Sequence, residues 1–154
     1  MTAGEVWMLA ALAEARKGLG TTSPNPAVGA VVVHAGKIIA KGFHRFAGGP
    51  HAEIAALKKI KRVPPGAALY ITLEPCSTAG RTPACTDAIV RSGIRRVVVG
   101  SVDPNPAHRG RGLGILRRHG VKVQTGAAEP ACKEIVAAFA NPALNPMDDA
   151  AELP

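Results

Sequence analysis

The 154 residues, 47% hydrophobic and 19% charged, suit one globular domain and exclude a disordered chain. The apolar runs are far shorter than a membrane span, no signal-peptide pattern opens the chain, and three is an odd cysteine count, so we expect a cytoplasmic protein with reduced thiols and no membrane segment. The net charge of +8 favours a phosphorylated small molecule or a nucleic acid as partner, although scattered charges are more often a solvated basic surface.

Hydrophobic periodicity predicts the elements of the first half of the chain. In order, we expect a helix, two strands of a hairpin, a second helix and a third strand over 3–19, 27–34, 37–43, 51–60 and 68–73. The tight turn of the hairpin falls at Ala35-Gly36. A turn-rich break with two prolines, residues 21–26, separates the first helix from the hairpin.

The second half alternates helix and strand. We expect elements over 83–92, 95–100, 113–119, 121–125 and 130–139, the second and fourth being strands. Thr82 would cap the first of these helices, Pro83 would open it and Gly93 would end it. This order implies an α/β fold, a mixed sheet with helices on both faces. Residues 141–154 are expected to be a C-terminal tail.

Two short motifs carry residues suited to chemistry. His51-Ala52-Glu53 stands at a helix start, and Cys76 follows Glu74-Pro75, with eight residues between Cys76 and Cys85. One His and two Cys suit Zn²⁺, and three protein ligands leave the fourth tetrahedral position open for water. Zinc lowers the pKa of such a water towards neutrality, and a nearby carboxylate can take and return its proton. The motifs therefore predict a catalytic zinc site with His51, Cys76 and Cys85 as ligands and Glu53 as acid/base.

Each of these residues taken alone has an ordinary explanation: a capping or core histidine, a buried cysteine, a surface acid. The combination is what indicates a metal site. It matches the zinc-deaminase pattern H-x-E followed by P-C-x-x-C, except that the cysteines are separated by eight residues rather than two. Cys132 lies outside any motif and is expected to be a core or half-exposed thiol.

Longer segments make the resemblance specific. The chain resembles the deaminase domain of riboflavin biosynthesis in TSPNPAVGAVVV (22–33), AGGPHAE (47–53), TLEPCS (72–77), GRTPAC (80–85) and DPNP (103–106). That family releases ammonia from a 2,5-diamino-6-(ribosylamino)pyrimidinone 5′-phosphate. The resemblance implies a zinc deaminase domain over residues 1–140, a cytidine-deaminase-like α/β/α sandwich with a mixed five-stranded sheet, and self-association into a homo-oligomer.

The resemblance also implies substrate contacts. Asn25 and His44 would face the pyrimidine and sugar, Arg81 would lie near the ribose or phosphate, and Asp103 and Asn105 would contact the ribose side. An arginine is suited to bidentate contact with a phosphate. Ordinary alternatives exist, since Asn25 precedes a proline as turn formers do and Asp103 opens a rigid loop.

Some features depart from the family. Thr78 stands where the family usually has a histidine, and Arg109 where it has a small residue. The substrate is therefore expected to be the ribosyl compound, its ribityl form or another aminated ring. Bacterial members usually continue into a reductase domain, whereas this sequence stops at Pro154. We expect a stand-alone deaminase with a separate reductase, recruitment to a related ring, or a shortened form of a longer chain.

Two other functions stay open at the level of sequence. One is a zinc deaminase for another base, nucleoside or tRNA, and the other is a non-catalytic, zinc-stabilised protein that binds nucleic acid. Three Phe, one Tyr and one Trp provide few stacking residues, which makes a nucleic-acid partner the weaker expectation. A structural zinc site would also normally have four protein ligands.

Overall fold

The computed structural model describes residues 1–78 and 84–138. Within them the elements follow the order α1 (Ala3–Arg16), β1 (Gly29–His34), β2 (Lys37–Phe43), α2 (Ala52–Leu57), β3 (Ala68–Leu73), α3 (Cys85–Ser92), β4 (Arg96–Ser101), α4 (Arg111–Arg118), β5 (Lys122–Thr125) and α5 (Glu129–Ala137). The proposed tail, residues 141–154, and the proposed helix start at Thr82 and Pro83 lie outside the described residues. No helix of the described part is both long and apolar enough to cross a membrane.

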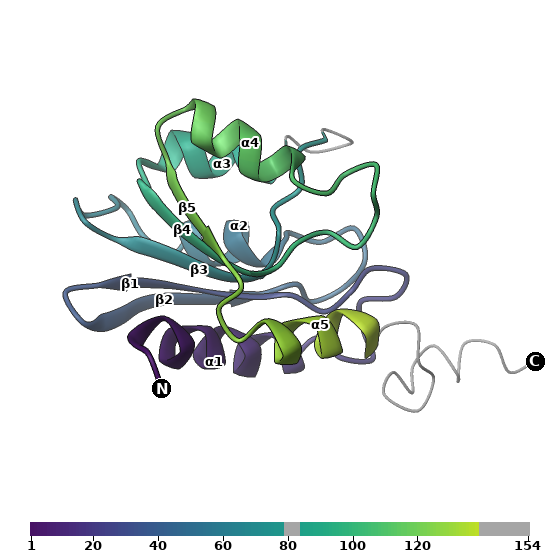
Figure 1. Ribbon diagram of the computed structural model, residues 1–154. Helices are drawn as coiled ribbons and strands as arrows, with labels where there is room; N and C mark the ends of the chain where they lie inside the picture. Colours follow the sequence, from purple (N-terminus) through teal and green to yellow (C-terminus); the bar gives the residue numbers. More distant parts are fainter. Residues whose placement is uncertain (79–83, 139–154) are drawn as a thin grey trace, which may run out of the picture.

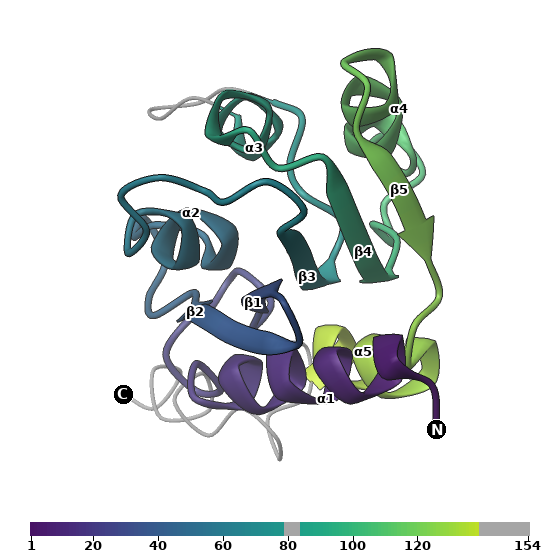
Figure 2. The ribbon, with the colours of Figure 1, turned by 90° about the vertical axis from the view of Figure 1, so that its left-hand side faces the viewer.

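The strands form one mixed sheet in the order β2-β1-β3-β4-β5. The pairs β1–β2 and β1–β3 are antiparallel, while β3–β4 and β4–β5 are parallel. Helices α1 and α5 cover one face, and α2, α3 and α4 cover the other (Figures 1 and 2). The expected three-layer α/β/α sandwich with a mixed five-stranded sheet is confirmed.

Strand alternation divides the core between the two faces. Val97 and Val99 of β4 pack in the cluster under α2, α3 and α4, whereas Val98 packs in the cluster under α1 and α5. All three side chains are buried, because helices cover both faces of the sheet at this strand. The parallel half of the sheet brings the C-terminal ends of β3 and β4 together, where ligands bind in open α/β sheets.

Two glycines let helices lie close to the antiparallel half of the sheet. A Cβ on Gly29 would stand 2.0 Å from the carbonyl oxygen of Ala11 in α1, and one on Gly42 would stand 2.5 Å from that of Ala52 in α2. The hairpin turn at Ala35 and Gly36 has φ of 51° and 73°, the positive values that such a tight turn requires. The predicted turn is confirmed.

Several predicted helix boundaries are wrong. Helix α3 begins at Cys85, with Ala84 rather than Thr82 as its N-cap residue, and α5 ends at Ala137. The first helix ends at Arg16, because the chain turns through i→i+3 bonds at Lys17 and Leu19, and Leu19 then packs on the core from this turn. Likewise, α2 ends at Leu57, and the residues up to Ile60 form turns with i→i+3 bonds. Helix α4 begins at Arg111, two residues earlier than expected, because the Glu74 side chain accepts from the N–H groups of Gly110 and Gly112 at its start.

Candidate metal centre and active site

The structure brings His51, Cys76 and Cys85 together. Their potential ligand atoms all lie within 4.8 Å of one another. His51 Nδ1 is 3.0 Å from Cys85 Sγ and 3.8 Å from Cys76 Sγ. Each comes from the end of an element: His51 is the N-cap residue of α2, Cys76 follows β3, and Cys85 is the first residue of α3.

The electrostatics of the cluster favour a cation between the three side chains. Hydrogen bonding from Cys85, and further bonds from His51 and the Cys85 backbone, lower the pKa of the Cys76 thiol to about 4. The hydrogen bond with Cys76 raises the pKa of His51, and the Cys85 thiol has a raised pKa because it donates to Cys76 and is buried. Without a metal the three groups thus share protons that a divalent cation would displace.

Glu53 lies beside this cluster in the first turn of α2 and is only 2% exposed. Burial raises its pKa from the ordinary value of 4.5 to about 7. Among the described residues its Oε1 has no hydrogen-bond partner, which is uncommon for a buried carboxylate oxygen. A His/Cys/Cys set suits Zn²⁺, and three protein ligands leave a position open beside a carboxylate able to exchange protons. The residues present therefore fit a catalytic zinc ion.

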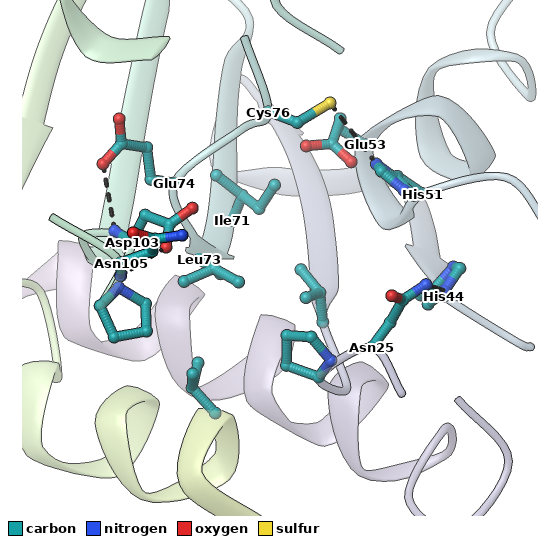
Figure 3. Close-up of a pocket in the computed structure, with 14 residues that line it drawn as sticks. Asn25, His44, His51, Glu53, Ile71, Leu73, Glu74, Cys76, Asp103 and Asn105 are labelled. Carbon is teal, nitrogen blue, oxygen red and sulfur yellow. Dashed lines mark hydrogen bonds between the residues drawn. The ribbon is translucent and has the colours of Figure 1, made fainter. Parts of the chain in front are cut away.

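A cavity of about 390 Å³ opens next to the cluster. Figure 3 shows Glu53 and Cys76 at one side of it, Asn25 and His44 at another, and Asp103 and Asn105 across from these. The lining residues are Asn25, Pro26, Val28, His44, His51, Glu53, Ile71, Leu73, Glu74, Cys76, Asp103, Pro104, Asn105 and Val136. Four of the five predicted substrate contacts thus lie on one cavity, and the fifth, Arg81, lies outside the described residues.

His44 fixes which end of the Asn25 amide faces this cavity. Nδ1 of His44 is 3.0 Å from the carbonyl oxygen of Pro50, which can only accept, so Nδ1 carries the proton. Burial lowers the pKa of His44 and favours the neutral ring, whose Nε2 then accepts from Asn25 Nδ2 at 3.2 Å. The amide nitrogen is turned to His44, and the amide oxygen faces the cavity (Figure 3).

Asp103 and Asn105 stand on the opposite wall in a stiffened loop. Asp103 Oδ1 accepts from the N–H of Asn105 at 2.9 Å, and Asn105 Oδ1 accepts from the N–H of Ala107 at 3.0 Å. The Arg109 guanidinium donates to the carbonyl oxygens of Asp103 and Pro104. The rigid-loop alternative therefore describes this segment, and the same segment also lines the cavity. Arg109 holds the loop together through these bonds.

The sequence did not single out Glu74 or the apolar wall of the cavity. Glu74 is buried at the end of β3 and accepts three backbone hydrogen bonds from the segment 103–112. A glutamate directly before Pro75-Cys76 was a signal that could have drawn attention to it. Val136 reaches the cavity from α5, and no local pattern indicates this. Three acidic residues, Glu53, Glu74 and Asp103, line the cavity, and no described Lys or Arg does.

Comparison with known proteins identifies the family to which the chain belongs. The family "Cytidine and deoxycytidylate deaminase zinc-binding region" matches residues 1–101. A riboflavin biosynthesis protein RibD from Aquifex aeolicus is 53% identical over 129 residues, which are 84% of this chain and 36% of that protein. A diaminohydroxyphosphoribosylamino-pyrimidine deaminase from Buchnera aphidicola is 46% identical over 78% of this chain and 82% of its own length.

The fold agrees with a solved relative. The crystal structure of a diaminohydroxyphosphoribosylaminopyrimidine deaminase/5-amino-6-(5-phosphoribosylamino)uracil reductase from Thermotoga maritima matches with a TM-score of 0.82 and 46% identity, over 90% of this chain and 40% of that one. This chain therefore spans well under half of the Aquifex and Thermotoga proteins, and most of the Buchnera one. It belongs to the zinc-binding cytidine and deoxycytidylate deaminase family, within the group of the riboflavin-biosynthesis pyrimidine deaminases.

Proposed function

We propose that the chain is a zinc-dependent hydrolytic deaminase acting on 2,5-diamino-6-(ribosylamino)pyrimidinone 5′-phosphate or its ribityl form. The observation that carries the proposal is the convergence of the His51, Cys76 and Cys85 ligand atoms within 4.8 Å, next to a cavity lined by the buried Glu53. Relatives named for this reaction support the choice of substrate.

In this proposal His51, Cys76 and Cys85 hold the zinc ion, which when bound supplies a Lewis acid that lowers the pKa of water. Glu53 takes a proton from the attacking water and delivers it to the departing amino group. A buried carboxyl group at the edge of the cavity and beside the metal ligands is placed to make both transfers. The reaction balances as water plus the ring C–NH₂ giving a ring carbonyl and ammonia.

The polarity of the cavity supports an amino-substituted ring. Asn25 presents its carbonyl oxygen there, because its nitrogen is used by His44. With the carboxylates of Glu53 and Asp103, the described polar side chains are predominantly hydrogen-bond acceptors. A diaminopyrimidine offers N–H donors from its ring and its amino groups. We propose that Asn25 and His44 select such a ring and that Asp103 and Asn105 receive the sugar.

The phosphate contact and the partner enzyme are proposed from the charge of the chain and from its relatives. Arg81 would bind the phosphate, in keeping with the net charge of +8. A reductase would act on the neighbouring step, since the Thermotoga relative carries both names. We further propose that residues 1–140 form the deaminase unit and that the protein forms a homo-oligomer. We also propose that it works in the reducing cytoplasm, where its thiol ligands stay reduced.

One panel of assays tests the substrate. Zinc content is measured first, and then ammonia release from the ribosyl and ribityl diaminopyrimidinone phosphates, cytidine, guanine and tRNA. The proposal expects turnover of at least one of the two pyrimidinone phosphates and none of the others at a comparable rate. Turnover of cytidine or tRNA alone would replace the substrate and leave the metal site standing. Bound zinc with no turnover of any compound would contradict a catalytic role.

A further inference from the structure

Glu74 has a buried carboxyl group that forms no ion pair among the described residues. Its side chain is at the end of β3 and is 6% exposed, and neither of the ion pairs among the described residues includes it. Oε1 accepts from the backbone N–H groups of Asp103 at 3.1 Å and Gly110 at 3.0 Å, and Oε2 accepts from that of Gly112 at 3.1 Å. Figure 3 shows the bond to Asp103. Both carboxyl oxygens of Glu74 are thus occupied by backbone N–H donors.

These bonds also explain where α4 begins. Gly110 is its N-cap residue, with φ of 81°, no side chain of its own to cap the helix and no acidic residue in the first turn. Glu74 supplies that cap from the end of β3, where a negative charge meets the positive end of the helix. The first turn also lies directly on the neighbouring peptide, because a Cβ on Gly112 would stand 2.3 Å from the carbonyl oxygen of Pro75.

The position of Glu74 in the chain gives this clamp a functional consequence. Glu74 precedes the proposed zinc ligand Cys76 by two residues, and the segment that it holds carries Asp103 and Asn105. One side chain thus joins the loop that bears a metal ligand to the loop that forms the opposite wall of the cavity. We propose that Glu74 is a positioning residue that sets the distance between the metal centre and the wall formed by Asp103 and Asn105. This inference rests on the proposed function.

A merely structural role makes a different prediction. If Glu74 only capped α4, its loss would lower stability and leave substrate affinity unchanged. If it positions the wall, its loss displaces Asp103 and Asn105 while the metal ligands stay in place. KM then rises, whereas zinc content and kcat stay near their wild-type values.

The test is Glu74→Gln, which keeps the shape but turns one acceptor oxygen into an N–H₂ group facing a backbone N–H. The matched control is Glu14→Gln, which changes a carboxylate that is also buried, at 5% exposure, but lies in α1 and pairs with Lys17. Zinc content, hydrogen exchange of the amides of Asp103, Gly110 and Gly112, and KM and kcat are measured for both. The KM is measured with the compound of the panel that the wild type deaminates.

We expect Glu74→Gln to speed hydrogen exchange at these three amides. We also expect it to raise KM at least about tenfold, because substrate binding must then restore the segment that the lost hydrogen bonds had held in place. Glu14→Gln should do neither. Unchanged exchange, or faster exchange with an unchanged KM, would overturn the positioning role. An inactive wild type would instead refute the proposed function, and the exchange measurement would still decide whether Glu74 holds the segment. If Glu74→Gln does not fold, Glu74→Asp, which keeps the charge on a shorter chain, is measured, and a wild-type KM and exchange pattern would overturn the proposal.

Discussion

The backbone N–H of Cys85 points at the sulfur of Cys76, with 3.3 Å between the two atoms. Because Cys85 is the first residue of α3, this N–H belongs to the positive end of a helix and favours the thiolate form of Cys76. The bond holds the start of α3 against Cys76, although eight residues separate the two cysteines in the chain. A wide gap between the cysteines is therefore compatible with one metal centre.

The two sulfurs should be required for zinc, and the third cysteine should not. Cys76→Ala and Cys85→Ala are each expected to weaken zinc binding by more than about 100-fold, which exceeds the cost of losing an outer-shell partner. Cys132→Ala is the matched control, because Cys132 is buried in the core under α1 and α5. Metal analysis and competition with a chelator measure the effect. Full zinc binding by Cys76→Ala, or equal loss in Cys132→Ala, would contradict the assignment.

Glu53 should destabilise the metal-free protein at neutral pH. Burial raises its pKa from 4.5 to about 7, so the folded state holds this proton more tightly than the unfolded state. The resulting stability is present below pH 4.5 and is lost as the pH rises through 7. Glu53→Gln should therefore be more stable than wild type at pH 8, by up to about 3 kcal/mol, and should lose this advantage near pH 4.5. Urea unfolding with chelator and reductant measures both; an equal difference at the two pH values would contradict this explanation.

The Asn25 carbonyl should matter for binding the ring. Asn25→Leu keeps the approximate shape and removes the acceptor, so a ring N–H would stay unpaired and KM should rise at least about tenfold. His44→Phe removes the acceptor that holds the amide nitrogen and should raise KM by a smaller factor. The control is Phe46→Leu, since Phe46 is 54% exposed and does not line the cavity. A wild-type KM for Asn25→Leu would show that the ring binds elsewhere.

Local sequence patterns predicted those strands and turns that interactions between residues close in the chain determine. The bounds of β3 at Ala68 and Leu73 and the turn at Ala35 follow from alternation and turn chemistry, and the structure has them as predicted. The cluster of His51, Cys76 and Cys85 was also predictable, because each residue stands at the end of a recognisable element.

What the sequence could not show depends on contacts between distant segments. The start of α4 is set by Glu74, which accepts from amides 29 to 38 residues away. Leu19 continues the apolar spacing of α1, although the helix has already ended at Arg16, because a turn can bury the same side chain. The orientation of the Asn25 amide depends on His44, whose own proton is placed by Pro50. Such pairings leave no period in the sequence.

Two Gly→Ala changes should have opposite effects. A Cβ at Gly42 would stand 2.5 Å from Ala52 O and Ala56 N, so Gly42→Ala should push α2 off the sheet and cost about 1–3 kcal/mol. Zinc affinity should fall as well, because α2 carries Glu53 and begins after His51. Gly114 in α4 has no atom within 4 Å of a built Cβ, and Gly114→Ala should stabilise the protein by up to about 1 kcal/mol. Thermal unfolding distinguishes them, and a stabilising Gly42→Ala would show that α2 can shift freely.

Glu53 is proposed to transfer protons at a zinc centre held by His51, Cys76 and Cys85. The most direct measurement compares ammonia release by zinc-loaded wild type and zinc-loaded Glu53→Gln, with the ribosyl and ribityl diaminopyrimidinone phosphates as substrates. We expect wild-type turnover of one of them, and a fall in kcat of at least about 100-fold in Glu53→Gln with zinc content unchanged. Full ammonia release by zinc-loaded Glu53→Gln would contradict the claim.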